Sequence, residues 1–197
     1  MERLAVEMGA KTIIVRCDVA LRPQAEWLLG YIRETFGSDG GQLRDGFKLQ
    51  VGWSILSLRE QNGKLVINEP NYYGDPFTEC HDDISCTLRV QVEQNAILQL
   101  AEVDDAVPAL FQDKVVLAKG CLDEKRVYLE RTKNSPPGDS GWYIGPAAGG
   151  KRKPALEAIY VYDLLKERPA LLQVLALPPG YLVVFDGDKI EGWEAAQ

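Results

Sequence analysis

The stretch "RVYLERTKNSPPGDSGWYIG", residues 126–145, sets the pattern for the C-terminal half of this 197-residue chain. Two runs rich in β-branched and aromatic residues, "RVYLERT" and "WYIG", favour strands. Between them, Gly138 and Gly141 can adopt the positive φ angles of a turn, and Asp139 and Ser140 can bond the local backbone. The sequence therefore predicts strand, turn and strand, with the tryptophan of "WYIG" turned to one face of a sheet.

The segments around this stretch extend the same pattern. "KVVLAKG" precedes it, and "AIYVYDLL", "YLVVF" and "KIEGW" follow it, all with strand-like runs. "PALLQVLAL", residues 169–177, indicates a short helical patch. We therefore expect a strand-rich α+β domain with little helix over residues 114–197.

The N-terminal half also mixes strand and helix patterns. "TIIVRC", residues 12–17, predicts a strand, and "RPQAEWLLGYIRETFG", residues 22–37, predicts a helix with Pro23 in its first turn. Asn62-Gly63 lies between two strand-like runs and predicts a hairpin. The apolar stripe expected on the helix consists of Trp27, Leu28, Tyr31, Ile32 and Thr35.

The segment "ISCTLRVQVEQNAILQL", residues 84–100, fits two structures. Its first residues alternate apolar and polar side chains, which is typical of a strand. A strand over the whole segment would exceed the usual ~3 to 10 residues. A helix capped by Asp82 or Asp83 fits the length, with apolar residues at four-residue spacing. Strand and helix both stay open from the pattern alone, and the length favours the helix. The spaced residues are Ile84, Leu88, Val92 and Ala96.

The segment "AEVDDAVPALFQD", residues 101–113, has acidic residues, a proline and no clear period. We interpret it as the connection between two halves. The chain is therefore predicted to be an α+β protein with an N-terminal α+β domain over residues 1–113 and a second domain over residues 114–197.

Composition excludes several classes of function. The net charge of −7 and the isoelectric point near 4.9 argue against direct binding of nucleic acid, which needs clustered Lys and Arg, and suit a basic protein partner. The longest apolar runs fall short of the roughly 20 residues of a membrane helix. The N-terminus lacks the apolar core of an export signal, and the four irregularly spaced cysteines suit reduced thiols. We expect a cytoplasmic protein without a membrane partner.

Two catalytic motifs have partial matches. Ser140 in "GDSG", with His81 and Asp104 before it, follows the chain order of chymotrypsin-like proteases, but Trp142 is bulky where that family needs a turn for substrate. "GPAAGGK" has P-loop spacing, but Arg152 replaces the hydroxyl that would bind Mg²⁺, and Pro154 interrupts the expected helix. Neither motif predicts an enzyme.

Cys80, His81 and Cys86, with Asp82 and Asp83 between them, could suggest a metal site. Zinc sites need a second ligand pair at recognisable spacing, and the sequence offers none nearby. We interpret these residues as an acidic helix cap beside ordinary thiols, and expect neither metal nor cofactor.

Three features of the C-terminal half occur together: an opening strand that ends near Lys119-Gly120, "DSGW" at residues 139–142, and Leu177, Pro178 and Gly180 after the helical patch. With these features, about residues 114–190 resemble immunity-protein family thirty-three of bacterial polymorphic toxin systems, formerly a domain of unknown function. This chain departs from the family by the glycine-rich basic insertion at residues 145–154.

The resemblance implies a cytosolic protein that binds and neutralises a cognate toxin, such as a nuclease effector of a contact-dependent or type VI secretion system. The family has no catalytic set to carry over. Acidic and aromatic residues are the candidate contacts with a basic toxin. The alternatives are a non-catalytic ligand-binding or regulatory module and a small serine hydrolase. The candidate contacts are Asp82, Asp83, Asp104, Asp105, Tyr72 and Tyr73.

Overall fold

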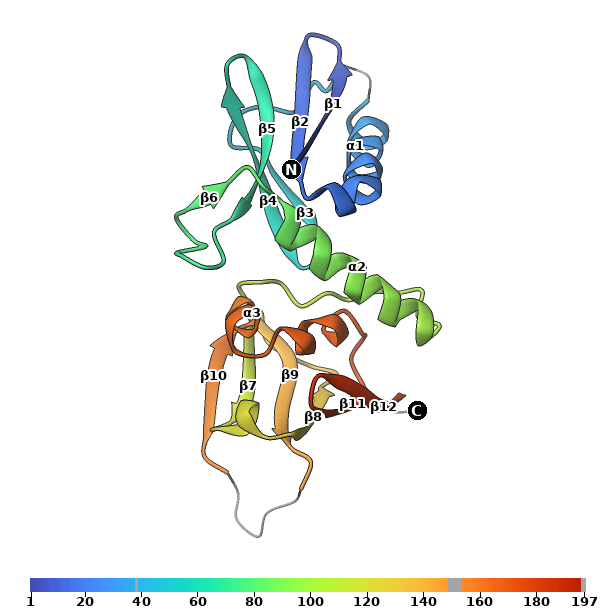
Figure 1. The fold of residues 1–197 in the computed structure, drawn as a ribbon, viewed down its shortest axis with the longest axis vertical. Helices are drawn as coiled ribbons and strands as arrows, with labels where there is room; N and C mark the ends of the chain where they lie inside the picture. Colours follow the sequence, from blue (N-terminus) through green and yellow to red (C-terminus); the bar gives the residue numbers. More distant parts are fainter. Residues whose placement is uncertain (38, 149–153, 196–197) are drawn as a thin grey trace. The chain divides into compact units, whose positions relative to one another are not determined.

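The computed structural model describes residues 1–37, 39–148 and 154–195, and the chain forms two compact units, Met1–Val92 and Glu93–Gln197 (Figure 1). Each unit contains a β-sheet with helical segments, so the predicted α+β fold is confirmed. Within the described residues, no helix is long and apolar enough to cross a membrane.

The N-terminal unit is built on one sheet with the strand order β1-β2-β5-β4-β3, and β6 pairs with β5. Strands β2 and β5 pair in parallel, and the other neighbouring strands pair antiparallel. The hairpin predicted at Asn62-Gly63 joins β4 to β5. The elements are β1 (Glu2–Met8), β2 (Lys11–Cys17), a 3₁₀ helix (Val19–Leu21), α1 (Arg22–Phe36), β3 (Lys48–Val51), β4 (Ser54–Gln61), β5 (Lys64–Pro70) and β6 (Cys80–His81). Helix α2 (Ser85–Leu100) begins in this unit and continues into the C-terminal unit.

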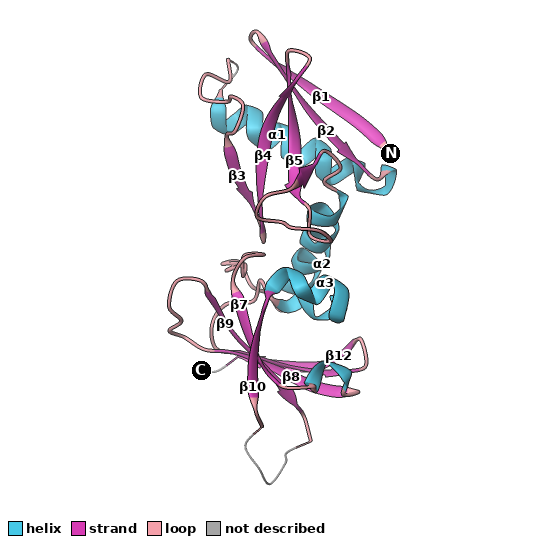
Figure 2. Cartoon of the chain, turned by 90° about the vertical axis from the view of Figure 1, so that its left-hand side faces the viewer, coloured by secondary structure: helices cyan, strands magenta, loops and turns pink. Residues whose placement is uncertain are grey.

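Helix α1 covers one face of this sheet, as Figure 2 shows. Pro23 lies in its first turn, where a missing N–H costs nothing, and Gly37 follows its last residue. The buried residues of α1 are Ala25, Leu28, Leu29 and Ile32, which pack in the same core as alternate residues of β2, β4 and β5. The predicted stripe is therefore partly wrong. Trp27 and Tyr31 are 57% and 42% exposed.

Helix α2 confirms the helical alternative for residues 84–100. Asp83 accepts hydrogen bonds from the backbone N–H and the hydroxyl of Ser85, so the predicted cap is Asp83. Ile84 and Leu88 are buried, but Val92 is exposed, and the predicted apolar stripe therefore holds only in the first turns.

The C-terminal unit also has one sheet, with the order β10-β7-β9-β8-β11-β12. Strands β7 and β9 are parallel, and the other pairs are antiparallel. The predicted helical patch is present as a 3₁₀ helix, Pro169–Val174. The other elements are β7 (Lys114–Ala118), a 3₁₀ helix (Cys121–Asp123), β8 (Arg126–Arg131), β9 (Asp139–Pro146), β10 (Leu156–Tyr160), a 3₁₀ helix (Val161–Asp163), α3 (Leu164–Glu167), β11 (Tyr181–Asp186) and β12 (Lys189–Ala195).

The segment that we interpreted as a connection, residues 101–113, packs within the C-terminal unit. The N–H groups of Val107 and Ala109 donate to the carbonyls of Ala176 and Leu175, both at 3.0 Å, and Ala109 and Phe111 are buried. The compact units therefore divide N-terminal of the predicted boundary at residues 113 and 114. Which residues fold independently stays a prediction.

Candidate functional site

The acidic pair Asp82 and Asp83 lies in the N-terminal unit, beside the end of β2. Asp82 forms an ion pair with Arg16, and both side chains are about a third exposed. The carboxylate of Asp83 caps α2, while the N–H of Ile84 donates to the carbonyl of Arg16 at 3.0 Å. Both carboxylates are thus held in place by local structure and keep part of their surface free.

The two adjacent tyrosines point to different environments. Tyr72 is 1% exposed and stacks on Trp53 with ring centroids 4.7 Å apart. Its hydroxyl bonds the hydroxyls of Ser54, at 2.5 Å, and Thr87, at 3.2 Å, and burial raises its pKa. Tyr73 is 64% exposed. Only Tyr73 presents its ring at the surface.

Asp104 and Asp105 lie in the other unit, on an exposed bend after α2. The six predicted contact residues are therefore divided between the two units. Four of them belong to the N-terminal unit, and the last two belong to the C-terminal unit.

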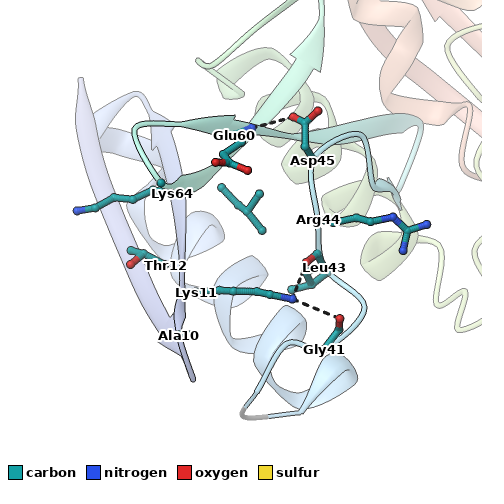
Figure 3. A pocket seen from close by; sticks show the side chains of 11 residues that line it. Ala10, Lys11, Thr12, Gly41, Leu43, Arg44, Asp45, Glu60 and Lys64 are labelled. Atoms are coloured by element: carbon teal, nitrogen blue, oxygen red, sulfur yellow. Dashed lines mark hydrogen bonds between the residues drawn. The ribbon is translucent and has the colours of Figure 1, made fainter.

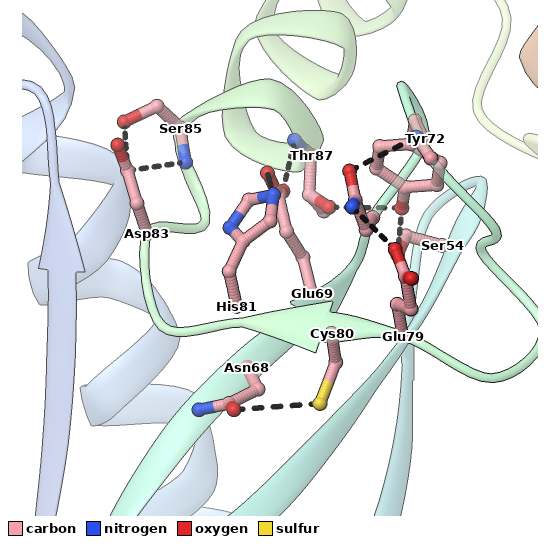
Figure 4. Close-up of polar contacts among 12 residues, drawn as sticks. Ser54, Asn68, Glu69, Tyr72, Glu79, Cys80, His81, Asp83, Ser85 and Thr87 are labelled. Carbon is pink, nitrogen blue, oxygen red and sulfur yellow. Dashed lines mark hydrogen bonds and ion pairs between the residues drawn. The ribbon is translucent and has the colours of Figure 1, made fainter.

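A buried carboxylate that the sequence analysis did not single out lies next to His81 (Figure 4). Glu69 is 1% exposed; its Oε2 accepts the backbone N–H of Thr87 at 2.7 Å, and its Oε1 lies 3.8 Å from Nε2 of His81. Burial raises the pKa of Glu69 to about 7, although the hydrogen bonds from Thr87 oppose this shift. The group therefore titrates near neutrality at the N-terminus of α2.

Cys80 and Asn68 project from the face of β5 and β6 opposite to Glu69 and His81, as Figure 4 shows. Sγ of Cys80, which is exposed, lies 3.5 Å from Oδ1 of Asn68. No three His, Cys, Asp or Glu side chains in the described parts of the chain are placed to hold a metal ion.

A cavity of about 270 Å³ opens at the other end of the N-terminal sheet (Figure 3). Nζ of Lys11 donates to the carbonyls of Gly40 and Leu43, both at 2.8 Å, and so ties the loop after α1 to β2. Asp45 Oδ1 accepts the backbone N–H of Glu60 at 2.8 Å. These cavity-lining groups stabilise the loop itself.

The "DSGW" turn is built as the sequence predicts, but it lies inside β9 rather than before it. Gly138 and Gly141 have φ angles of 85° and 76°. Oδ1 of Asp139 accepts the N–H of Gly141 at 2.8 Å, and Oγ of Ser140 accepts the N–H of Trp142 at 3.2 Å. The turn shifts the register of β7 against β9, and Trp142 is 1% exposed.

The hydroxyl of Ser140 has a structural role. The residue is 2% exposed, and the hydroxyl donates to the carbonyl of Lys114 at 2.7 Å. It is engaged in joining β7 to β9, whereas a serine nucleophile needs access to substrate and a hydrogen bond to a base. The P-loop match cannot be placed, because residues 149–153 lie outside the described residues.

A buried arginine donates hydrogen bonds to main-chain carbonyls around this turn. Arg131 is 6% exposed, and its Nε donates to the carbonyl of Ser140 at 3.1 Å. Its Nη1 donates to the carbonyl of Leu177 at 2.6 Å and to the carbonyl of Val107. Its own carbonyl accepts the N–H of Gly180 at 2.8 Å. Burial lowers its pKa to about 10, so the guanidinium stays charged near neutrality.

A family model described as Imm33-like domain matches residues 93–195, more than half of the chain. The chain belongs to the Imm33-like domain family. The match confirms the resemblance of the C-terminal half to immunity-protein family thirty-three, and it begins at the first residue of the C-terminal compact unit. Neither the curated proteins nor the solved structures include a match to this chain.

The geometry explains why the Imm33-like resemblance rests on those particular residues. Ser140 of "DSGW", Leu177 and Gly180 all bond Arg131, although they are far apart in sequence. Gly120 has a φ angle of 79°, which favours glycine at the turn after β7. The hydrogen bonds that join Ser140, Leu177 and Gly180 to Arg131 hold the Imm33-like domain together.

Sequence reasoning missed the arginine although a signal was present. Val127 and Leu129 are buried on β8, and Arg131 continues the same alternation. A charged residue at an inward strand position is therefore a signal for a buried hydrogen-bonding role.

Proposed function

We propose that this protein is an immunity protein that binds and neutralises a cognate bacterial toxin by covering the active site of the toxin. The match of the Imm33-like domain to residues 93–195 carries this proposal. The structural role of Ser140 supports action by binding rather than by chemistry. The protein would act in the cytoplasm, before the toxin reaches its substrate.

The proposed toxin is basic, and a nuclease effector of a contact-dependent or type VI secretion system is the kind of partner that we infer. Nucleases present cationic clefts to phosphate, and the net charge of −7 would speed their association with this chain. Stable complexes of this type bury on the order of 1,200 to 2,000 Å² of surface. An interface of that size needs several of the exposed segments of this chain.

The proposed acidic contacts differ in how they can act. Asp104 and Asp105 are exposed and can meet a basic surface directly. Asp82 and Asp83 are already engaged with Arg16 and Ser85, so a toxin cation would compete with these partners. Tyr73 can contribute an exposed ring, whereas Tyr72 would have to leave the core, and we do not include its side chain in the proposed interface.

Co-expression with the adjacent toxin-bearing reading frame tests the function. Cells that die from that frame alone should survive when this chain is present, and the two proteins should co-purify with nanomolar affinity, about −12 kcal/mol. Added salt should slow association more than it changes dissociation, because screening acts on steering. A harmless neighbour, or a toxic one that this chain neither binds nor silences, would remove the proposal.

Charge reversal separates the two acidic pairs. Asp82→Lys with Asp83→Lys, and Asp104→Lys with Asp105→Lys, should each weaken binding if the pair lies at the interface. The first double variant also loses a helix cap, so its melting temperature must be measured beside its affinity. Full affinity in both variants would remove these contacts and leave the function standing.

A further inference from the structure

Helix α1 of the N-terminal unit exposes two stacked aromatic rings. Trp27 and Tyr31 are 57% and 42% exposed, with ring centroids 5.7 Å apart and planes at 13°. Other residues of the helix form its buried face, so these rings lie outside the core of the unit. Trp and Tyr are among the residue types that contribute most of the binding energy at protein interfaces.

A glycine lies beside the rings, in the interior of the same helix. Gly30 is exposed, and a Cβ built at this position would have no heavy atom within 4 Å. Its φ is not in the left-handed region, so neither the backbone conformation nor internal packing requires a glycine. Glycine weakens a helix relative to alanine. A missing side chain next to exposed rings leaves room for a partner to approach the helix closely.

One charged residue lies on the same face of α1 as the two rings and the glycine. At helical spacing, Glu34 lies on the same face as Trp27, Gly30 and Tyr31. No salt bridge to Glu34 is present among the described residues. Arg22 forms ion pairs with Glu2 at 2.7 Å and with Glu26 at 2.8 Å. At helical spacing, Arg33 lies on the same side of α1 as Arg22 and Glu26. A carboxylate without a salt-bridge partner beside two aromatic faces favours a cation.

We propose that Trp27, Gly30, Tyr31 and Glu34, the aromatic strip of α1, form a contact surface for a basic segment of the toxin. A lysine or arginine of that segment lies over the rings, its charge meets Glu34, and its backbone approaches over Gly30. This inference rests on the proposed function. It also places toxin recognition in the unit outside the Imm33-like match, which begins at residue 93.

The first test measures the affinity of the purified chain for the product of the adjacent toxin-bearing frame. Trp27→Ala and Tyr31→Ala should each weaken binding at least tenfold, with little change in melting temperature, because both rings are exposed. Trp193→Ala is the matched control, since this tryptophan is 39% exposed on β12 of the other unit. Weaker binding by the Trp193 variant alone would place recognition in the Imm33-like domain and overturn the inference.

The second test uses the glycine, because its substitution leaves the helix intact. Gly30→Ala should raise the melting temperature, and Gly30→Gln should not lower it, since both residues favour helix more than glycine does. Gly30→Gln should nevertheless weaken binding at least tenfold by filling the space beside the rings. Glu34→Lys should weaken binding more than Glu34→Gln, and low salt should widen this difference.

The outcomes separate this inference from the proposed function. If the wild-type chain binds and silences the toxin while the Trp27, Gly30 and Tyr31 variants bind equally well, the strip is not the contact and the function stands. If the wild-type chain itself binds no toxin, both fail. If the Trp27 variant changes the size of the free chain in solution, a second copy occupies the strip and the inference is overturned.

Discussion

The two units satisfy their buried polar groups in opposite ways. In the Imm33-like domain, the buried guanidinium of Arg131 donates to the carbonyls of loops and strand ends, and Arg168 does the same with the carbonyls of Glu124 and Gly187. In the N-terminal unit, the buried carboxylate of Glu69 accepts the N–H of Thr87 at the start of α2. One unit buries guanidinium groups, and the other buries a carboxyl group.

This difference determines how each unit responds to pH. An arginine whose pKa is about 10 stays charged throughout the neutral range, so its bonds to carbonyls do not change. A glutamate whose pKa is about 7 gains or loses its charge within that range. We therefore expect the Imm33-like domain to be the constant part of the molecule and the N-terminal unit to be its pH-sensitive part.

The largest expected effect comes from removing the buried guanidinium. Arg131→Met should lower the free energy of unfolding by about 3 to 5 kcal/mol, because it leaves the carbonyls of Ser140, Leu177 and Val107 buried without their donor. Denaturant unfolding measures this, with the exposed Lys133→Met as control. If Arg131→Met is as stable as the wild type, the buried guanidinium is not needed for stability, and the proposed difference between the two units is wrong.

The tryptophans of the two units offer a matched comparison. Trp142→Ala should cost roughly 3 to 5 kcal/mol, because the ring is 1% exposed and its Nε1 lies 3.4 Å from the carbonyl of Leu175. Trp27→Ala should change stability by less than about 0.5 kcal/mol. Thermal unfolding of both variants measures the difference. Similar melting temperatures would show that the indole of Trp142 contributes little packing.

The carboxylate of Glu69 should give a pH dependence of opposite sign to that of an ordinary ion-paired acid. Between about pH 4.5 and 7, the unfolded chain loses this proton and the folded chain keeps it. Stability should therefore fall by about 3 kcal/mol as pH rises through this window, and then level off. Urea unfolding at about pH 4 and about pH 8, on either side of this window, measures the change.

Glu69→Gln should remove this part of the pH dependence, because the amide can still accept the N–H of Thr87 but cannot ionise. Glu60→Gln is the control, since Glu60 is exposed. An unchanged slope in the Glu69 variant would mean that other groups cause the pH dependence, and the contrast between the units would lose its basis.

The smallest effect concerns the hydroxyl of the turn. Ser140→Ala should lower stability by about 1 to 2 kcal/mol, because the carbonyl of Lys114 and the N–H of Trp142 lose their partner. Binding of the toxin should be unchanged. Calorimetry gives the first quantity and a binding titration gives the second, with the partly exposed Ser57→Ala as control. If the protein has a hydrolytic activity and Ser140→Ala lowers it more than about a hundredfold, the serine hydrolase hypothesis is supported instead.

Local patterns predicted the elements whose causes are local. The turn at Gly138 and Gly141 follows from backbone conformations that glycine tolerates, and the sequence was sufficient to identify it. The helix over residues 84–100 followed from length and a cap. The alternation of its first residues is also compatible with a strand, so only the whole segment distinguished the two.

Features that depend on distant partners were not predictable in the same way. The stripe of α1 was misassigned because two neighbouring arcs of the helix are apolar, and only the position of the sheet selects Ala25 and Leu29 over Trp27 and Tyr31. Tyr72 follows a strand in an aromatic, turn-like segment, yet its hydroxyl finds Ser54 and Thr87 in the core. Such partners are brought together by the fold and leave no local pattern.

The edge strands of the two sheets bear on how the chain behaves at high concentration. The outer strands are β1 and β3 in one sheet and β10 and β12 in the other, and each leaves backbone N–H and C=O groups unpaired. Strand β3 has four residues and β10 has five, while β1 carries Glu2, Arg3 and Glu7, and β12 carries Glu191 and Glu194. Short or charged edges disfavour the addition of a strand from another molecule. The edge strands of both sheets therefore disfavour aggregation by strand addition.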